Sequence, residues 1–380
     1  MTDQWNTPER QALRKMVADF TETEIAPHLP DWERDGAVPR ALHEKAGTLG
    51  LLELGFPESA GGAGEFLDFL IANEQIQLSG GSMGLLGALM THSIAAPHIA
   101  ASGNADLIDR FVRPSLSGHK IGSLAVTEPG GGSDVASLRT TAVRDGDHYV
   151  VNGAKTYITS GSRADFVTTA VRTGGEGYGG VSLLVVETGT PGFSVGRKLD
   201  KMGCLCSDTA ELFYDNVRVP AGNLVGPEGT GFKQIMKRFD SERLLLGVQA
   251  YSMAQRCLDL AIEWARTRIT FGQPLAQRQV IRHKLAEMAR QTTAARVFVR
   301  QVAERYATGE RVSAEVAMAK NTAVFAAEHV VHEALQIFGG MGYMRESEVE
   351  RHYRDARLLG IGGGATEVMN ELIAKSLPLD

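Results

Sequence analysis

The sequence has few cysteines, and their spacing disfavours two common kinds of site. Cys204, Cys206 and Cys257 are an odd number, and the first two are separated by one residue, which suits neither a disulfide framework nor a zinc-type pair. We therefore expect reduced thiols, no metal centre and a cytoplasmic location. The polar opening of the chain, Met-Thr-Asp-Gln-Trp-Asn, shows no signal-peptide pattern.

Long hydrophobic runs and an excess of positive charge are also missing. The nearest apolar stretch, residues 84–96, is short and holds Thr91 and His92, whereas a membrane span needs ~18 apolar residues. The net charge of -6 argues against general nucleic-acid binding. What is present is ordinary: 380 residues, 43% hydrophobic and 22% charged, predict a soluble globular protein of about two or three domains.

The spacing of apolar residues divides the chain into three parts. Helical spacing begins at Thr7-Pro8, a cap followed by proline, and continues in residues 40–54, 65–78 and 105–116. Short strand-like runs follow in residues 138–144, 148–151, 155–159, 166–172, 181–187 and 209–214, with a hairpin turn at Asp145-Gly146. Helical spacing returns over residues 232–268, 279–306, 313–338 and 367–376. We expect an α+β multidomain fold with a helical domain at 1–121, an antiparallel β-domain at 122–228 and a helical domain at 229–380.

The run from Leu124 to Asp134, Leu-Ala-Val-Thr-Glu-Pro-Gly-Gly-Gly-Ser-Asp, is the most informative local pattern. A strand-like segment ends at Thr127, and three consecutive glycines, residues 130–132, then stop any regular element. Such glycines cost conformational entropy, so the loop favours the approach of a flat or anionic ligand to bare backbone N–H groups. Thr127 and Ser133 add hydroxyls beside it. The alternative is a plain glycine-rich turn between strands.

Glu242 is the candidate base. It shares a helix face with Phe239, Leu246 and Gln249, at steps of three and four residues. A carboxylate on a mostly apolar stripe is costly unless it is paired or its pKa is raised, and a raised pKa suits a general base near neutral pH. The alternative is that Glu242 and Arg243 are solvated helix charges or a local ion pair.

A second glycine run, residues 362–364, leads into a predicted helix with Thr366 as its cap. A helix N-terminus after glycines suits an anion or a polarised carbonyl oxygen, although a plain turn between helices explains the same residues. Arg268, at the end of the long helical pattern, suits either a phosphate or the helix dipole. His329 and His332 lack a third ligand, so we interpret them as packing histidines.

Five motifs carry a resemblance to a known family. They are Thr-Glu-Pro-Gly-Gly-Gly-Ser-Asp from Thr127, Asn152-Gly-Ala-Lys, Arg268-x-x-Phe-Gly, Gln336-x-x-Gly-Gly-x-Gly and Arg354-Asp-Ala-Arg. In this combination and order, the chain resembles an acyl-CoA dehydrogenase over essentially its whole length. The resemblance implies an N-terminal helical domain, a middle β-domain and a C-terminal four-helix bundle. It also implies a homotetramer that binds FAD without a covalent link.

The resemblance further implies which residues contact FAD. The flavin ring is expected to meet Leu124, Val126 and Thr127, with Tyr157 and Thr159 on the matching strand, where many relatives have tryptophan in place of Tyr157. Gly132 and Ser133 match positions that face the pyrophosphate and the acyl-CoA. The residues matched to the FAD of a neighbouring subunit are Arg268, Phe271, Gln279, Gln336 and Gly340. Thr366 completes the expected cofactor-binding set.

The implied acyl-CoA site contains one departure from most relatives. Asp240 and Arg243 match positions near the CoA moiety. In medium- and short-chain relatives the catalytic glutamate lies in the loop after the Arg-Asp-Ala motif, where this chain has Gly363. The chain instead resembles the branch of long-chain and isovaleryl-CoA dehydrogenases, whose base lies on the long helix at the place of Glu242. Ala365, where relatives usually have threonine, weakens one implied FAD contact.

The expected activity is FAD-dependent α,β-dehydrogenation of an acyl-CoA thioester to a trans-2-enoyl-CoA. Glu242 removes the α-proton, the backbone N–H of Gly363 and a flavin ribityl hydroxyl bind the thioester oxygen, and an electron-transferring flavoprotein receives the electrons. Three alternatives stay open: a flavin oxidase or monooxygenase of the same fold, a non-catalytic helical binding protein, and a nucleic-acid-associated member of the wider superfamily. Glu242 disfavours a monooxygenase, and the short stretch after Lys375 disfavours the last. We expect no nucleic-acid or membrane partner.

Overall fold

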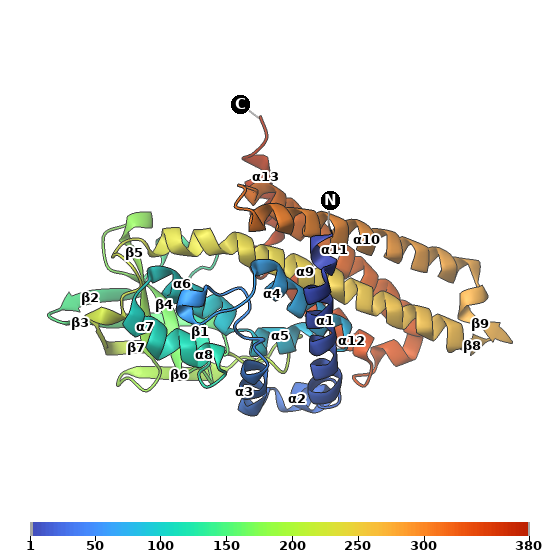
Figure 1. The fold of residues 1–380 in the computed structure, drawn as a ribbon, viewed down its shortest axis with the longest axis horizontal. Coiled ribbons are helices and arrows are strands. Elements are labelled where there is room, and N and C mark those ends of the chain that lie inside the picture. Colours follow the sequence, from blue (N-terminus) through green and yellow to red (C-terminus); the bar gives the residue numbers. More distant parts are fainter. Residues whose placement is uncertain (1–2, 379–380) are drawn as a thin grey trace.

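The computed structural model describes residues 3–378 (Figure 1). A set of helices packs beside a curled sheet at one end of the molecule, and long helices run from that sheet to the opposite end. The N-terminal helices are α1 (Pro8–Phe20), α2 (Leu29–Asp35), α3 (Arg40–Thr48), α4 (Phe66–Leu78), α5 (Met83–Leu89), α6 (His92–Ser102), α7 (Ala105–Leu107) and α8 (Arg113–Leu116). The C-terminal helices are α9 (Gly231–Thr267), α10 (Gln279–Ala307), α11 (Ser313–Phe338), α12 (Glu348–Leu359) and α13 (Thr366–Ala374).

The start of α1 and the end of α3 illustrate how local chemistry sets helix bounds. The Thr7 side chain accepts a hydrogen bond from the backbone N–H of Arg10 at 3.4 Å, and Pro8 is the first helical residue, which confirms the predicted cap. The prediction of a helix through residue 54 is wrong, because α3 ends at Thr48. Gly50 has a φ of 73° there, and its N–H donates to the carbonyl of Gly47, which closes the helix.

The β-domain is one seven-stranded sheet in the order β1-β4-β2-β3-β7-β6, with β5 on the other side of β4. Its strands are β1 (Gly122–Ala125), β2 (Thr141–Asp145), β3 (His148–Thr159), β4 (Phe166–Arg172), β5 (Val181–Glu187), β6 (Phe193–Lys198) and β7 (Thr209–Pro220). The predicted antiparallel pairing is confirmed for most neighbours, including the β2–β3 hairpin. The pairing of β1 with β4 is parallel, and a single bridge joins β2 to β4 in the same sense; the sequence did not predict either.

The long helix α9 connects the parts of the molecule. Its first turns pack on the sheet, where Ile235 is buried with Phe166 and Leu183, and its later turns enter the core of the helical bundle with α10 and α11. A short two-stranded hairpin, β8 (Ile269–Thr270) with β9 (Gln273–Pro274), joins α9 to α10 at the end far from the sheet (Figure 1). A single rod of 37 residues therefore carries side chains to both ends of the molecule.

The three cysteines are buried, in keeping with the expectation of free thiols. Burial raises the pKa of the Cys204, Cys206 and Cys257 thiols well above the usual range, because a thiolate would lose its solvation there. No helix among residues 3–378 combines the length and apolar character needed to cross a membrane.

Candidate active site

A cavity of about 190 Å³ opens between α4, α6 and α9. Its wall is mostly apolar and aromatic, and includes Phe56, Phe66, Phe69, Ile94 and Leu245. Its polar lining consists of Ser93, Arg238, Ser241, Glu242 and Tyr306. A mostly apolar hollow with a few polar groups is the usual form of a small-molecule site.

Glu242 is the carboxylate in this cavity. Its side chain is only half-buried because it faces the hollow, yet the surrounding protein strongly disfavours its charged form. Burial raises the pKa of Glu242 to about 7, although the charges of Arg243 and Arg238 oppose that rise. This carboxylate is half ionised near neutral pH, as a general base requires. The alternative of a solvated helix charge does not fit this position.

Arg243 does not pair with Glu242. Its guanidinium donates to the carboxylate of Asp240 at 3.1 Å, lies over the Phe239 ring at 5.2 Å, and donates from Nε to the carbonyl of Gly363 at 3.4 Å. Arg243 is buried, and Asp240 is partly exposed. The two residues expected near CoA therefore lie together, beside the loop that holds Gly363.

Hydrogen bonds from Lys320 and Arg243 hold the glycine loop after α12. The Lys320 ammonium, almost completely buried, donates to the carbonyl of Gly362 at 2.8 Å and also to the carbonyl of Gly364. Gly363 has a φ of 63°, and a Cβ atom placed on it would lie 2.3 Å from Cδ1 of Leu246. The positive φ favours glycine here, and a larger side chain would require Leu246 to move. Lys320 and Arg243 fix the orientation of the peptide groups on either side of Gly363.

Thr366 is not the cap of α13, so that prediction is wrong. The residue before it, Ala365, is the cap and has no side-chain hydrogen bond, because alanine offers no acceptor. Thr366 is the first helical residue, and its hydroxyl donates back to the carbonyl of Gly360 at 3.3 Å. The hydroxyl closes the glycine loop on itself.

The loop after β1 is held by a buried ion pair. Lys155, from β3, donates to the carbonyl of Val126 at 3.1 Å and to the Glu128 carboxylate at 2.9 Å. Glu128 also accepts from the backbone N–H groups of Arg139 and Thr140. Burial opposes ionisation of Glu128, but Lys155 and these donors outweigh it and lower its pKa to about 2. Burial lowers the pKa of Lys155 to about 8, against the pull of Glu128.

The glycines of this loop leave open space above the backbone. A Cβ atom at Gly130 or Gly131 would meet no protein atom within 4 Å, and neither residue has a positive φ. The fold itself therefore does not require glycine at these two positions. Gly132 and Ser133 are exposed beside them. The open backbone fits the close approach of a ligand better than a turn that only connects strands.

The expected flavin-contacting residues lie side by side on β1 and β3. The N–H of Thr156 donates to the carbonyl of Thr127 at 3.0 Å, which ties the two segments together. Leu124, Val126, Thr127 and Thr159 are all half-buried. Tyr157 sits at a break in the β3–β7 register with a φ of 59°, and its ring is 69% exposed. Apolar side chains, hydroxyls and an exposed aromatic ring on one surface fit a flat heteroaromatic cofactor.

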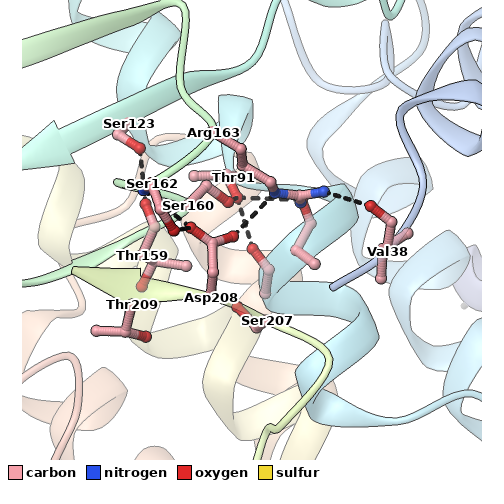
Figure 2. Close-up of polar contacts among 12 residues, drawn as sticks. Val38, Thr91, Ser123, Thr159, Ser160, Ser162, Arg163, Ser207, Asp208 and Thr209 are labelled. Carbon is pink, nitrogen blue, oxygen red and sulfur yellow. Dashed lines mark hydrogen bonds and ion pairs between the residues drawn. The ribbon is translucent and has the colours of Figure 1, made fainter. Parts of the chain in front are cut away.

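A polar network adjoins this surface at Thr159 (Figure 2). Asp208 accepts hydrogen bonds from the N–H and hydroxyl of Ser162 and forms an ion pair with Arg163 at 2.9 Å. Arg163 in turn donates at 2.8 Å to the carbonyl of Val38, between α2 and α3, and to that of Ala88 in α5. The turn after β3 is thereby fixed to the helical domain, while the Ser123 hydroxyl donates to the carbonyl of Thr159 at 2.7 Å. Thr159 belongs to the predicted site, and the other residues of this network do not.

A second group of predicted residues lies at the opposite end of the molecule from the sheet (Figure 1). Arg268 precedes the β8–β9 hairpin, and Phe271 lies in its turn with a φ of 48° and a ring that is 98% exposed. Gln279 begins α10, Gln336 lies near the end of α11 and Gly340 follows it; all three are exposed. The Trp264 and Phe338 rings stack at 4.8 Å and join the ends of α9 and α11. The structure thus separates this group from the Thr127 surface of the same chain.

Two charged residues of the site, Arg238 and Lys320, were not predicted from the sequence. Arg238 lines the cavity one helical turn before Glu242, and the spacing of four residues on one helix face was a usable signal. Lys320 had no comparable signal, because a lysine within an alanine-rich helix is usually a solvated charge.

Comparisons with known proteins agree on one family. Residues 7–119, 123–217 and 229–377 match the N-terminal, middle and C-terminal domains of acyl-CoA dehydrogenase. The chain is 38% identical over 373 residues to an acyl-CoA dehydrogenase of Bacillus subtilis, covering 98% of each chain. It is 37% identical over 375 residues to the mitochondrial long-chain specific acyl-CoA dehydrogenase of Mus musculus, covering 98% of this chain and 87% of the relative.

A solved structure extends this agreement to three dimensions. The crystal structure of a probable acyl-CoA dehydrogenase from Mycobacterium abscessus superposes with a TM-score of 0.97 at 64% identity, covering 98% of this chain and 99% of that one. Acyl-CoA dehydrogenases are FAD-dependent oxidoreductases. On the sequence match along nearly its whole length and on its fold, this chain belongs to the acyl-CoA dehydrogenase family.

Proposed function

We propose that this enzyme dehydrogenates an acyl-CoA thioester between Cα and Cβ, giving a trans-2-enoyl-CoA, with Glu242 as the base. One observation carries the proposal: a carboxylate with a pKa of about 7 in a mostly apolar cavity, with no ion-pair partner in the part of the chain that the structure describes. Its partner in sequence, Arg243, is engaged by Asp240 instead. Glu242 is therefore free to accept the α-proton on a carboxylate oxygen.

The α-proton of a thioester is weakly acidic, so the negative charge that develops on the thioester oxygen needs fixed donors. In the proposal the backbone N–H of Gly363 is one of them. Lys320 and Arg243 support this role, because both bond carbonyls of the 362–364 loop and leave its peptide groups no freedom to turn. A donor that is already oriented loses no free energy to reorganisation during the reaction.

FAD, when bound, supplies the acceptor for the hydride that leaves Cβ. The Thr127 surface of β1 and β3 fits this cofactor, because Tyr157 offers an exposed ring and the bare backbone at Gly130 and Gly131 admits an anionic group. The residues proposed to hold it on this chain are Leu124, Val126, Thr127, Gly132, Ser133, Tyr157, Thr159 and Thr366. Ser133, Asp240 and Arg243 are proposed to bind the acyl-CoA.

The exposed residues at the far end of the bundle are proposed to complete the FAD site of a neighbouring subunit in a homotetramer. They are Arg268, Phe271, Gln279, Gln336 and Gly340. Support comes from Phe271, a phenylalanine on a positive-φ turn whose ring is almost fully exposed, with the Arg278 guanidinium 5.6 Å from the ring centroid. An electron-transferring flavoprotein is the proposed electron acceptor.

Anaerobic mixing of the FAD-loaded protein with saturated acyl-CoAs tests the proposal. Wild type should lose its yellow colour, and Glu242→Gln should do so at least 100-fold more slowly, since general-base contributions are roughly 10²–10⁴-fold. Glu263→Gln, an exposed glutamate on the same helix, is the matched control and should react like wild type. Equal rates for wild type and Glu242→Gln would exclude Glu242 as the base. Rapid peroxide formation in air would instead favour an oxidase.

A further inference from the structure

The catalytic cavity contains a positive charge that the proposed dehydrogenation does not use. Arg238 lies one turn before Glu242 on α9 and lines the same hollow. Among residues 3–378, the only hydrogen bond of its guanidinium runs from a terminal nitrogen to the carbonyl of Pro97 at 3.3 Å. No carboxylate in that part of the chain lies within ion-pair distance of it, whereas most arginines of this protein have such a partner.

The surroundings of Arg238 supply no ion-pair partner among residues 3–378, although the Glu242 carboxylate shares the cavity and interacts electrostatically with it at longer range. The neighbouring His98 is buried, and burial together with the charge of Arg238 lowers the pKa of its ring to about 4, so the ring is neutral. Ser241 donates its hydroxyl to the Arg238 carbonyl and leaves the guanidinium untouched. A guanidinium has five donors in a planar fork that matches a carboxylate. At Arg238 most of these donors have no acceptor among residues 3–378.

Binding a purely hydrocarbon acyl group beside this unmatched cation would be unfavourable, because the acyl group would displace water from the guanidinium without offering it an opposite charge. We infer that the acyl group of the substrate ends in a carboxylate that Arg238 binds, so that the enzyme acts on CoA monothioesters of dicarboxylic acids. This inference rests on the proposed function and adds the substrate class. The substrate carboxylate is retained: only the α-proton and the β-hydride leave, and a C=C bond forms between Cα and Cβ.

The spacing along α9 gives the length of the acyl group. Four residues at 1.5 Å each place Arg238 about 6 Å from Glu242 along the helix axis. A chain with its α-carbon at Glu242 and its carboxylate at Arg238 therefore spans about four or five bonds, at roughly 1.2 Å of extension per bond. This span favours acids of six or seven carbons over long fatty acyl chains.

The ion pair between Arg238 and the substrate carboxylate also keeps the pKa of Glu242 from rising further. A second carboxylate in the cavity would by itself raise the pKa of Glu242 further, since like charges disfavour ionisation. Bound to Arg238, that carboxylate is neutralised at the far end of the cavity. Arg238 is therefore a specificity-determining residue that leaves Glu242 able to ionise when an anionic substrate is present.

The test compares adipoyl-CoA with hexanoyl-CoA, which have the same chain length and differ only in the terminal carboxylate. We measure kcat/KM of the FAD-loaded enzyme for wild type, Arg238→Met and Lys237→Met. Lys237 is the exposed neighbour on the same helix and controls for the loss of one positive charge. Wild type and Lys237→Met should prefer adipoyl-CoA by roughly 10- to 100-fold, the usual worth of a hydrogen bond to a charged group. Arg238→Met should lose or reverse that preference.

A binding measurement separates recognition from turnover. The affinities of adipoyl-CoA and hexanoyl-CoA are measured by calorimetry for Glu242→Gln and for the double variant Glu242→Gln, Arg238→Met. In both proteins the slow reaction leaves the substrate unconverted during the measurement. Adipoyl-CoA binding should weaken roughly 10- to 100-fold on loss of Arg238, and hexanoyl-CoA binding should not weaken.

Three results would contradict either the role of Arg238 or the proposed dehydrogenation. If wild type prefers hexanoyl-CoA and Arg238→Met leaves the ratio unchanged, the inference about Arg238 is wrong while the dehydrogenation stands. If Arg238→Met slows both substrates equally and lowers stability, the residue only joins α9 to α6 through Pro97, and the inference is again wrong. If wild type reacts with no saturated acyl-CoA at all, the proposed function itself is wrong.

Discussion

Replacing Glu242 by glutamine should make the protein more stable at alkaline pH while removing its activity. The pKa of this carboxyl rises from 4.5 to about 7 in the folded chain because burial penalises its charge. A shift of about 2.5 units at 1.36 kcal/mol per unit is a cost of about 3 kcal/mol for ionising Glu242 in the folded state. Glutamine fills the same space and carries no charge, so it escapes this cost.

The sign of the pH dependence follows from the folded pKa lying above the unfolded one. The favourable contribution of protonated Glu242 is fully present below about pH 4.5 and is lost as pH rises through about 7. Wild type should therefore lose up to about 3 kcal/mol relative to Glu242→Gln between pH 5 and pH 8. Over the same range the wild-type kcat/KM should rise and level off above about pH 7, because the ionised form is the base.

Urea unfolding of the FAD-loaded proteins at pH 5 and pH 8 measures the difference. Glu263→Gln serves as the control, since Glu263 is exposed on the same helix and its loss should change stability equally little at both pH values. A Glu242→Gln protein that gains nothing over wild type at pH 8 would show that the carboxylate is well solvated. The assignment of Glu242 as a base tuned by burial would then be refuted.

Two further perturbations test the loops around the site. Gly363→Ala should lower the free energy of unfolding by about 1–2 kcal/mol because of the positive φ, and further because its Cβ would clash with Leu246; it should also slow turnover. Adding Leu246→Ala should remove only the part of the loss that comes from the clash. An unchanged unfolding midpoint for Gly363→Ala would contradict the conformational requirement. Lys155→Met should cost about 3–5 kcal/mol and lower the FAD retained per chain, because it leaves Glu128 buried without its partner. Adding Glu128→Gln should recover part of that stability, and equal stability of the single and double variants would argue against the ion pair.

The strongest sequence patterns predicted the elements best. The bounds of β4, β5 and α11 match the predicted runs, and α9 and α10 are within one residue at each end. Helices α5 and α6 were missed because they are apolar on nearly all sides, so no helical period distinguishes them from a generic buried run. The β6 strand was missed because most of its residues are exposed and polar.

The site was predictable where chemistry follows local spacing and unpredictable where it depends on distant contacts. Glu242 was found because helix periodicity puts it on an apolar stripe. The Glu128–Lys155 pair joins residues 27 apart, and Lys320 reaches a loop 42 and 44 residues away, so only tertiary structure reveals either contact. The parallel pairing of β1 with β4 was hidden for the same reason.

The inaccessible thiols make this protein a convenient host for site-specific chemistry. All three native cysteines lie in the interior with their thiol form strongly favoured, so alkylating reagents should leave the folded protein unmodified. A single cysteine introduced in place of Phe271 would then be the sole reactive handle. A fluorophore attached there would report directly on whether that end of the bundle meets another copy, and no native cysteine would have to be removed first.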